Sequence, residues 1–441
     1  MKATIKPIIL ASVAAAALLA SPAMAQQRIK LGNLIDYTGA KSSSGKFSGP
    51  GKVDAIDWIN KNGGINGKML DAEIVDYGYQ TRRSIQLYRK WKDEGAVAIL
   101  GYGTNDTEAM VGFVAQDRIP YFSFSYSGRL TDPTGASAKA KEGKVKPAPY
   151  NFFGQASYSD GNRALLMWAL EDWKKKGGRG RPKYMHMGDD HPYPLAPKEA
   201  GEAFARELGF DILPSIPYAL AGGDFKAQCL ALRAKAQCLA LRALDANYAF
   251  LANTTGSNVA LLRSCSRVGV NVQFMANIWG MDEGGMKTTG KAADGVVWVL
   301  GHMQWGSDVP GMKVMRDISN MSDPTGKAYR ALPYALGACQ VLQLAEGLKI
   351  ADKSGKLDGP GIKEALESLK DFVPTGTDGM CPRVTWSSTD HRSVDTVIIG
   401  RARIGGDTEK GEVADLVAAG TIKIEKVSEQ KVPRKPEWLG Y

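Results

Sequence analysis

The feature that most constrains the fold is a regular alternation of short apolar segments with amphipathic ones. Residues 29–35 alternate apolar with small or polar side chains, which predicts a strand. Val53, Ile56 and Ile59 follow at helical spacing, and Asn62 with two glycines predicts the end of a helix. The alternation continues with strands over 69–76, 96–100 and 120–124 and helices over 81–94 and 107–116. Strands that alternate with helices predict a parallel sheet with right-handed crossovers.

The alternation restarts after a loop rich in Pro, Gly and Lys, at 132–149. The expected second set comprises helices over 161–173, 197–208 and 257–268, and strands over 184–187, 212–216, 248–252 and 272–276. Long helices over 332–350 and 361–369 and a β-rich end over 383–404 follow. A chain of 441 residues with 44% hydrophobic residues is too long for one small core. We therefore expect an α/β protein with two doubly wound parallel-sheet lobes.

The N-terminus has the pattern of a secretory signal peptide. Lys2 and Lys6 flank the start of an apolar run, 8–20, which ends at Ala23-Met24-Ala25. The run is well short of the roughly 20 residues that a bilayer span needs, which disfavours the alternative of a membrane anchor. We expect residues 1–25 to be removed and the mature protein to be soluble and exported to the periplasm.

A nine-residue sequence, KAQCLALRA, occurs twice in succession, at 226–234 and 235–243. Nine residues make 2.5 helical turns, so the apolar faces of the two copies would point in opposite directions along one straight helix. We expect one copy to pack and the other to form an extra turn or bulge. A metal loop is the alternative, but no His or further Cys lies nearby at ligand spacing.

The duplication explains the odd number of cysteines, which is five. In an oxidising compartment they predict disulfides with one thiol left over. The local pairings are Cys229 or Cys238 with Cys265, and Cys339 with Cys381. Four cysteines already allow three arrangements, so the sequence leaves the connectivity open.

The net charge of +10 does not predict nucleic-acid binding. Export would separate the protein from cytoplasmic nucleic acid, and the basic stretches 174–183 and 423–435 lack interleaved aromatic residues. We expect both stretches to be solvated faces.

No motif requires catalysis. The nearest match to a nucleophile elbow, 124–128, has Phe124 in place of the first Gly, and no phosphate-binding loop is present. His186 and His191 flank two aspartates and could hold a metal, which leaves a metal-dependent hydrolase as an alternative. Their spacing crosses a strand end and its loop, so we expect a polar rim instead, with no enzyme activity, metal or cofactor.

Polar and aromatic residues cluster where the predicted strands end. In an open parallel sheet, ligands bind beyond the carboxyl ends of the strands, near helix N-termini. Hydroxyls and amides dominate in the first half of the chain, at Tyr37, Thr38, Ser42, Ser43, Ser44, Tyr102, Thr104, Asn105, Thr107, Ser125, Tyr126 and Ser127. Aromatic residues join them in the second half, at Tyr158, His191, Tyr193, Asn253, Thr254, Thr255, Asn277, Ile278 and Trp279. This combination predicts a small organic ligand clamped in a cleft.

Several short segments give the chain a resemblance to a known family. They are Tyr37-Thr38-Gly39, INKNGGING at 59–67, Gly101 with Thr104 and Thr107, Ile119-Pro120 leading to Ser125 and Ser127, Asp224-Phe225, and DPTG at 323–326. Together they resemble the periplasmic solute-binding proteins of ABC importers of the branched-chain amino acid type, over nearly the whole mature chain. The stretch from Asp224 to Tyr248 is nine residues longer than in that family, which marks the duplication as an insertion.

The resemblance implies a type I periplasmic binding fold with a three-strand hinge, crossing near Ser157, Gly301 and Gly379. Lobe 1 would comprise 26–157 and 301–378, and lobe 2 would comprise 158–300 and 379–441. It also implies a monomer that closes on a small-molecule ligand and docks on a membrane permease; a ligand-sensing subunit of a membrane receptor is the alternative. The implied ligand contacts are Ser44, Thr104, Asn105, Ser125, Ser127, Tyr158, Tyr193, Thr254, Ile278, Trp279 and Tyr329.

Two departures from the family affect the ligand. Amino-acid binders of the family carry acidic residues where this chain has Tyr158 and Ile278. An unpaired ammonium in a closed cleft costs several kcal/mol. The usual Asp-Pro after the second strand is also replaced, by residues 77–80. We expect a ligand without a compulsory ammonium, such as an aromatic or aliphatic carboxylate or an amide, unless Asp282 or Glu283 pairs with an ammonium.

Overall fold

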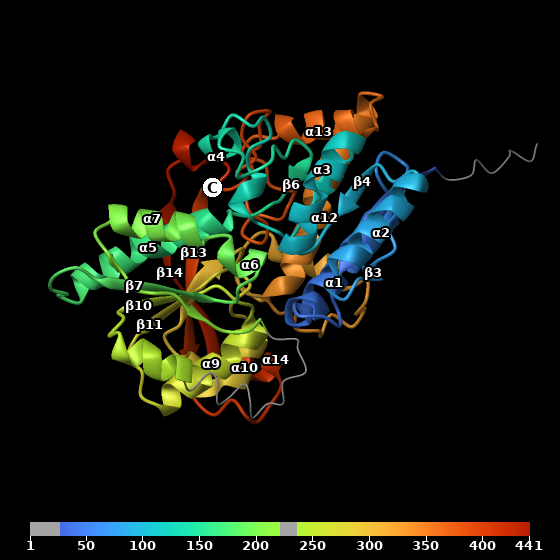
Figure 1. Cartoon of the computed structure of the whole chain (residues 1–441). Coiled ribbons are helices and arrows are strands. Elements are labelled where there is room, and N and C mark those ends of the chain that lie inside the picture. Colours follow the sequence, from blue (N-terminus) through green and yellow to red (C-terminus); the bar gives the residue numbers. More distant parts are fainter. Residues whose placement is uncertain (1–26, 221–235) are drawn as a thin grey trace, which may run out of the picture.

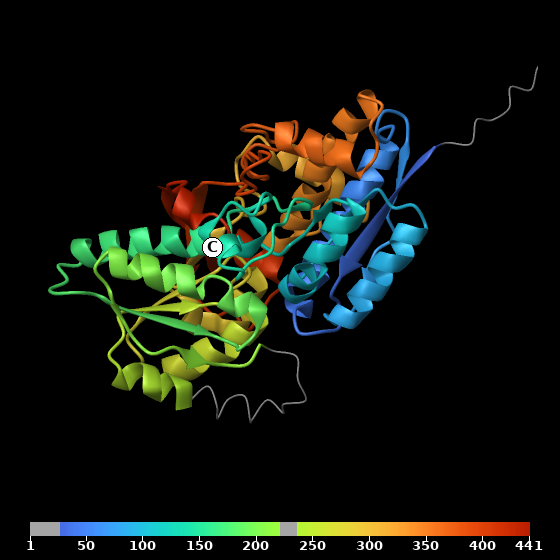
Figure 2. The same cartoon turned by 45° about the horizontal axis from the view of Figure 1, so that its top comes forward.

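Two α/β lobes, each built on its own sheet, make up the computed structural model, which describes residues 27–220 and 236–441 (Figures 1 and 2). Strands and helices alternate through both lobes, as the apolar pattern predicts. The predicted signal peptide and the first copy of the nine-residue duplication lie outside the described residues. None of the described helices combines the length and the apolar character needed to cross a bilayer.

The sheet of the first lobe is parallel, and within the described residues it has the order β2-β1-β4-β5-β6, with β3 also paired to β1. Its strands are β1 (Arg28–Ile35), β2 (Met69–Asp71), β3 (Val75–Asp76), β4 (Ala98–Leu100), β5 (Tyr121–Phe122) and β6 (Asn151–Phe152). The helices around it are α1 (Ser42–Lys61), α2 (Thr81–Asp93), α3 (Thr104–Asp117), α11 (Met312–Ser319), α12 (Leu332–Lys353) and α13 (Gly359–Ser368).

The sheet of the second lobe is mixed, and its described strands have the order β14-β13-β12-β11-β10-β7-β8, with β9 also paired to β7. They are β7 (Lys183–Gly188), β8 (Asp211–Ile212), β9 (Ile216–Pro217), β10 (Tyr248–Leu251), β11 (Gln273–Ala276), β12 (Val297–Leu300), β13 (Thr396–Ile404) and β14 (Ile422–Lys431). Strands β7 to β12 pair in parallel, whereas β13 and β14 add an antiparallel ribbon. The helices are α5 (Tyr158–Lys175), α6 (Pro192–Leu195), α7 (Lys198–Glu207), α9 (Thr255–Arg267), α10 (Glu283–Thr289) and α14 (Val413–Ala418).

Helix α1 begins at Ser42, well before the apolar residues that predict it. Its first turns carry glycines, which disfavour a helix in isolation. Tertiary packing explains them. A Cβ at Gly51 would lie 2.0 Å from the Tyr334 carbonyl oxygen of α12, and one at Gly337 would lie 2.1 Å from that of Ser48. The glycines therefore let the α1 and α12 backbones touch, which joins α12 to the first lobe.

Two further details differ from the sequence-based expectation. The segment 69–76 forms two short strands, β2 and β3, and the side-chain amide of Asn33 donates to the Ala72 carbonyl between them, at 3.1 Å. The basic stretch 423–435 is largely strand β14, whose backbone pairs with β13 while charged side chains alternate along it. The strand itself was not predicted, but Lys423, Lys426 and Lys431 are exposed, as expected of a solvated face.

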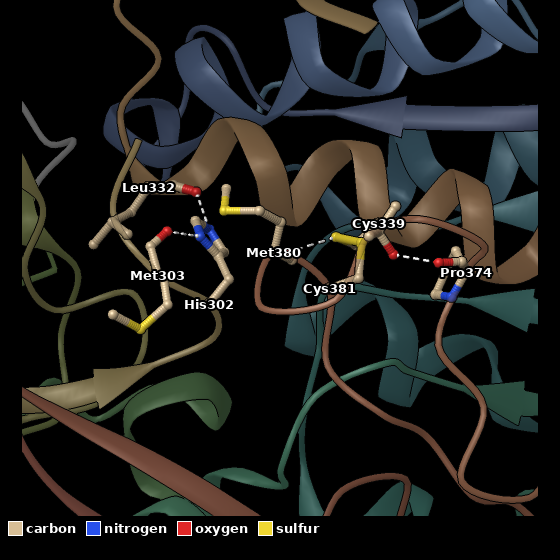
Figure 3. The surroundings of a disulfide bond; sticks show 8 residues. His302, Met303, Leu332, Cys339, Pro374, Met380 and Cys381 are labelled. Atoms are coloured by element: carbon tan, nitrogen blue, oxygen red, sulfur yellow. Dashed lines mark hydrogen bonds between the residues drawn. A yellow bond between two sulfur atoms is a disulfide. The ribbon is translucent and has the colours of Figure 1, made fainter. Parts of the chain in front are cut away.

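Both expected local disulfides are present. Cys238 bonds to Cys265 of α9, and Cys339 of α12 bonds to Cys381. The choice that the sequence left open between Cys229 and Cys238 therefore falls on Cys238, in the second copy of the duplication. Residues 236–243 are helical, and Cys238 and Leu241 are buried. Figure 3 shows the Cys339–Cys381 bond beside Met380, whose carbonyl oxygen lies 3.2 Å from the Cys339 Sγ atom.

The boundaries of the two lobes stay a prediction. Packing of α12 on α1 supports assigning 332–353 to the first lobe. After Gly379, however, the Trp386 ring still packs edge-on against Phe122 and Phe152 of the first lobe, with ring centroids 5.7 and 5.9 Å apart. This favours a third crossing nearer to Thr396, where β13 begins.

Candidate functional site

A small cavity lies between the two lobes, at the carboxyl ends of their parallel strands. Its lining residues are Lys41, Ser44, Tyr102 and Phe124 from the first lobe and Thr254 and Trp279 from the second. The space open to the centre of a water molecule is about 10 Å³, which is room for a single water. The structure is therefore a closed form in which side chains fill the cleft.

Three helix N-termini face this region. Helices α1, α3 and α9 begin after Lys41, Gly103 and Thr254, and in none of the three does the side chain of that preceding residue cap the helix within the described structure. The N-terminal end of a helix carries a partial positive charge and unpaired backbone N–H groups. The three helix N-termini therefore give this region a partial positive charge.

Lys41 adds a buried amino group to it, which carries a positive charge when it is protonated. The residue is only 5% exposed, and its Nζ atom lies 3.4 Å from the ring centroid of Tyr193 and 4.9 Å from that of Tyr79. Within the described residues, no carboxylate oxygen lies within 4.0 Å of this ammonium. Burial lowers the pKa of Lys41 to about 7, although Asp106 and Asp36 act in the opposite direction.

The two nearest buried carboxylates bond to other groups. Asp36 accepts the backbone N–H groups of Gly39 and Lys41, at 2.5 and 2.8 Å. Asp106 accepts the hydroxyls of Tyr77 and Tyr121, at 2.7 and 3.3 Å. Burial raises the pKa of Asp106 to about 6, against the opposing effect of the Tyr77 hydrogen bond. Neither carboxylate is free to turn toward the cavity.

Trp279 forms part of the wall that the second lobe contributes. Its indole stacks on Tyr126, with centroids 5.6 Å apart and planes at 17°, and it meets Phe124 edge-on at 5.4 Å. The indole Nε1 donates to the Tyr158 hydroxyl at 3.2 Å, and that hydroxyl donates to the Phe124 carbonyl at 3.1 Å. Stacking and hydrogen bonds together fix the ring across the lobe interface.

Of the residues that the sequence singled out, Ser44, Thr254 and Trp279 line the cavity. The buried hydroxyls of Ser44 and Thr254 have no hydrogen-bond partner in the described part of the chain. Other candidates lie at the strand ends around the site. The Ser125 hydroxyl donates to that of Thr104 at 3.0 Å, and the Tyr193 hydroxyl donates to Asn277 Oδ1 at 3.0 Å.

Four further candidates bond or pack elsewhere and do not line the cavity. Asn105 donates to Thr81, Ser127 donates to Glu108, Tyr329 donates to Glu283, and Ile278 approaches Gly301. The roles of all eleven candidates in ligand binding stay predictions. Sequence reasoning missed Lys41, because a lysine in a Ser- and Gly-rich turn is typical of a solvated surface. Its position just before a helix that follows a buried strand was the available signal.

Asp282 and Glu283, which were considered as partners of a ligand ammonium, accept hydrogen bonds within the protein. Asp282 caps α10 by accepting the Gly285 N–H at 2.8 Å. Glu283 accepts the Leu332 N–H and the Tyr329 hydroxyl, each at 2.9 Å. Burial raises the pKa of Glu283 to about 7. The described lining of the cavity contains no carboxylate.

His186 and His191, which were considered as metal ligands, have different surroundings. Burial lowers the pKa of His186 to about 3. His191 caps α6, accepting the Tyr193 N–H on Nδ1 at 3.3 Å, and its ring lies 5.6 Å from that of Tyr79. Across 27–220 and 236–441, no group of three or more His, Cys, Asp or Glu side chains is arranged to hold a metal ion.

A larger cavity, about 670 Å³ by the same measure, lies at the crossings between the lobes, near Gly301 and Asp395. Its guanidinium groups are already paired: Arg383 lies 2.7 Å from Asp378, and Arg434 lies 3.8 Å from Asp395. We therefore place the candidate site in the smaller cavity, where the buried hydroxyls of Ser44 and Thr254 have no partner in 27–220 and 236–441.

Comparison with known proteins gives a consistent result. The model of a family described as periplasmic binding protein matches residues 28–409. An ABC transporter substrate-binding protein from Aeropyrum pernix has a TM-score of 0.75 and 23% identity, over 94% of this chain and 98% of that one. A search of curated proteins finds no match.

Two further solved structures share the fold. A branched-chain amino acid ABC transporter protein from Thermus thermophilus, with bound valine, has a TM-score of 0.74 and 18% identity, over 93% of this chain and 97% of that one. A fatty acid ABC transporter substrate-binding protein from Thermomonospora curvata has a TM-score of 0.71 and 15% identity, over 88% and 94%. These likenesses confirm the predicted fold of two α/β lobes.

Proposed function

This chain belongs to the periplasmic binding protein family, and from that premise we propose that it is a solute receptor which captures a small organic ligand between its lobes and delivers it to the permease of an ABC importer. The observation that carries the proposal is the closed cavity. Both lobes contribute to it, and the buried hydroxyls of Ser44 and Thr254 have no hydrogen-bond partner there among the described residues. Groups of this kind are what a ligand would satisfy when the lobes close on it.

The ligand we propose lacks a compulsory ammonium group. Tyr158 and Ile278 stand where amino-acid binders of the family carry acidic residues, and Asp282 and Glu283 bond within the protein. The solved relatives are described as binding valine in one case and as serving fatty acid transport in another, so the fold accommodates different ligands. An aromatic or aliphatic carboxylate, or an amide, fits the present lining.

The cellular setting follows from the same proposal. Removal of residues 1–25 would release a monomer into the periplasm, where it would meet the membrane permease. Ligand capture and delivery require no catalytic step, so we assign no catalytic role to the residues around the cavity.

Thermal unfolding of residues 26–441 with a panel of compounds tests the proposal. The panel contains leucine, short amides, benzoate and related acids, and aliphatic acids. A ligand at about 100 times its Kd adds roughly 2.7 kcal/mol to stability. We expect at least one acid or amide to raise the Tm and leucine to leave it unchanged. The Trp279→Ala variant should lose the shift, and a panel in which no compound raises the Tm would contradict the receptor function.

A further inference from the structure

Two buried lysines lie near the strand ends, and their surroundings differ. The Lys52 ammonium donates to the carbonyl oxygen of Leu34 at 2.8 Å and lies 3.4 Å from those of Leu100 and Gly101. These oxygens belong to the ends of β1 and β4, so Lys52 is held by the sheet itself. Lys41 has no such oxygen among the described residues, and the faces of two tyrosine rings are its nearest partners.

The other charged and titratable groups near Lys41 do not complete its coordination. Asp36, at the end of β1, and Asp106, in the first turn of α3, have their oxygens occupied by backbone N–H groups or tyrosine hydroxyls. His191, from the second lobe, has its pKa lowered to about 4 by burial and by the charge of Lys41. A buried ammonium without a direct anionic partner is costly, and proteins retain such groups mainly at functional sites.

The hydroxyls of Ser44 and Thr254, which have no partner within the part of the chain that the structure describes, line the same cavity as Lys41. They come from opposite lobes, in or beside the first turns of α1 and α9. The two helix starts are close in space, because a Cβ at Gly256 would lie 3.3 Å from Ser43 Oγ. An ammonium, two hydroxyl donors and two helix N-termini converging on one point match the chemistry of a carboxylate.

Aromatic rings cover the rest of the cavity. Phe124, Tyr102 and Trp279 are in its lining, and Tyr126 stacks behind Trp279. These surfaces fit an apolar, flat body attached to the anionic group.

From this arrangement, and resting on the receptor function proposed above, we propose that the ligand is a small organic carboxylate without an ammonium group and that Lys41 is the residue that selects it. The Lys41 ammonium pairs with the carboxylate, the hydroxyls of Ser44 and Thr254 donate to its oxygens, and the rings of Phe124 and Trp279 cover its body. The lobes part to admit the ligand, since the closed cavity has room for one water.

Isothermal titration calorimetry with matched triads tests the selection. One triad is benzoate, benzamide and benzylamine; the other is isovalerate, isovaleramide and isopentylamine; leucine is added as the amino acid. Within a triad the apolar body is constant and only the charge changes. We expect an acid to bind at least about tenfold more tightly than its amide, the amines not to bind, and Lys41→Gln to remove the preference.

Two variants serve as controls. Lys46→Gln makes the same change on the exposed face of α1 and should leave all affinities within about twofold. Lys41→Arg keeps the charge and should retain the preference for acids, even if Lys41→Gln folds poorly. If amides, amines or leucine bind and the acids do not, or if Lys41→Gln keeps the preference, the carboxylate inference is wrong while the receptor function stands. If no compound binds, the receptor function itself is contradicted.

Discussion

The Nζ atom of Lys41 lies 3.4 Å from the ring centroid of Tyr193, and this contact joins the two lobes across the cavity. Lys41 precedes α1 of the first lobe, and Tyr193 lies in α6, which follows β7 of the second. A cation on an aromatic face in a desolvated site contributes up to about 2 kcal/mol, which is less than the cost of burying an ammonium. The closed form therefore holds Lys41 at a net cost in stability.

The first prediction follows from that cost. The pKa of Lys41 falls from 10.5 to about 7 in the folded protein, so the ligand-free protein loses stability as the pH falls from 10.5 to about 7, and the loss is complete below pH 7. We expect Lys41→Met to be roughly 1 to 3 kcal/mol more stable than the unmodified protein at pH 6, with the difference shrinking toward pH 10. Urea unfolding at pH 6, 8 and 10 measures this, with Lys46→Met as the exposed control. A less stable Lys41→Met at pH 6 would refute it.

The second prediction concerns Glu283, which joins α10 to the start of α12. Burial raises its pKa from 4.5 to about 7, so its stabilising contribution is complete below about pH 4.5 and is lost as the pH rises through 7. We expect Glu283→Gln to flatten the fall in stability between pH 5 and 7.5, by roughly 1 to 3 kcal/mol. Lys41 acts mainly above pH 7, so the two effects separate along the pH axis.

The same unfolding series measures the Glu283 effect. Glu409→Gln, at an exposed position, should leave the pH profile unchanged. A profile for Glu283→Gln that follows the unmodified protein between pH 5 and 7.5 would show that this carboxyl does not titrate there.

The third prediction compares Trp279, which lines the cavity, with His191, which does not. Trp279 lines it, stacks on Tyr126 and donates to Tyr158, whereas His191 caps α6 beside it. We expect Trp279→Ala to weaken the best-binding compound by about 100-fold and His191→Ala by no more than about threefold. Titration calorimetry measures both. Equal losses in the two variants would mean that Trp279 is not a wall of the site.

The fourth prediction concerns the disulfide that joins α12 to the loop after Gly379. Cys339 and Cys381 are 42 residues apart, so the bond restricts a long loop in the unfolded chain. We expect the double variant Cys339→Ala, Cys381→Ala to lose roughly 2 to 4 kcal/mol of unfolding free energy. Thermal and urea unfolding give the value, and the ligand affinity of the folded fraction should stay within about threefold. Unchanged stability would mean that the reduced chain keeps this loop closed by packing alone.

The sequence predicted the order of strands and helices well, because each buried strand and amphipathic helix has a local apolar pattern. The sequence-based prediction failed where contacts between residues far apart in the chain determine the structure. Helix α1 begins at Ser42, before the apolar residues that predict it, and contact with the α12 backbone explains Gly51 within it. The antiparallel ribbon of β13 and β14 was only partly predicted, since β14 has almost no apolar alternation.

The site was predictable in its placement and less so in its chemistry. Ser44, Thr254 and Trp279 could be found because strand ends and helix starts meet at one edge of each sheet. Lys41 was missed, because its burial depends on Tyr193, which is far away in sequence and belongs to the other lobe. A charged side chain that becomes buried only when the two lobes meet produces no periodic pattern in the sequence of either lobe.

The small volume of the interlobe cavity has a kinetic consequence. No compound larger than a water can enter the closed form, so every binding event has to pass through an open conformation. The observed association rate should rise with ligand concentration and then level off at the rate of opening. Release is limited in the same way, which makes the lifetime of the complex a property of the hinge as much as of the pocket.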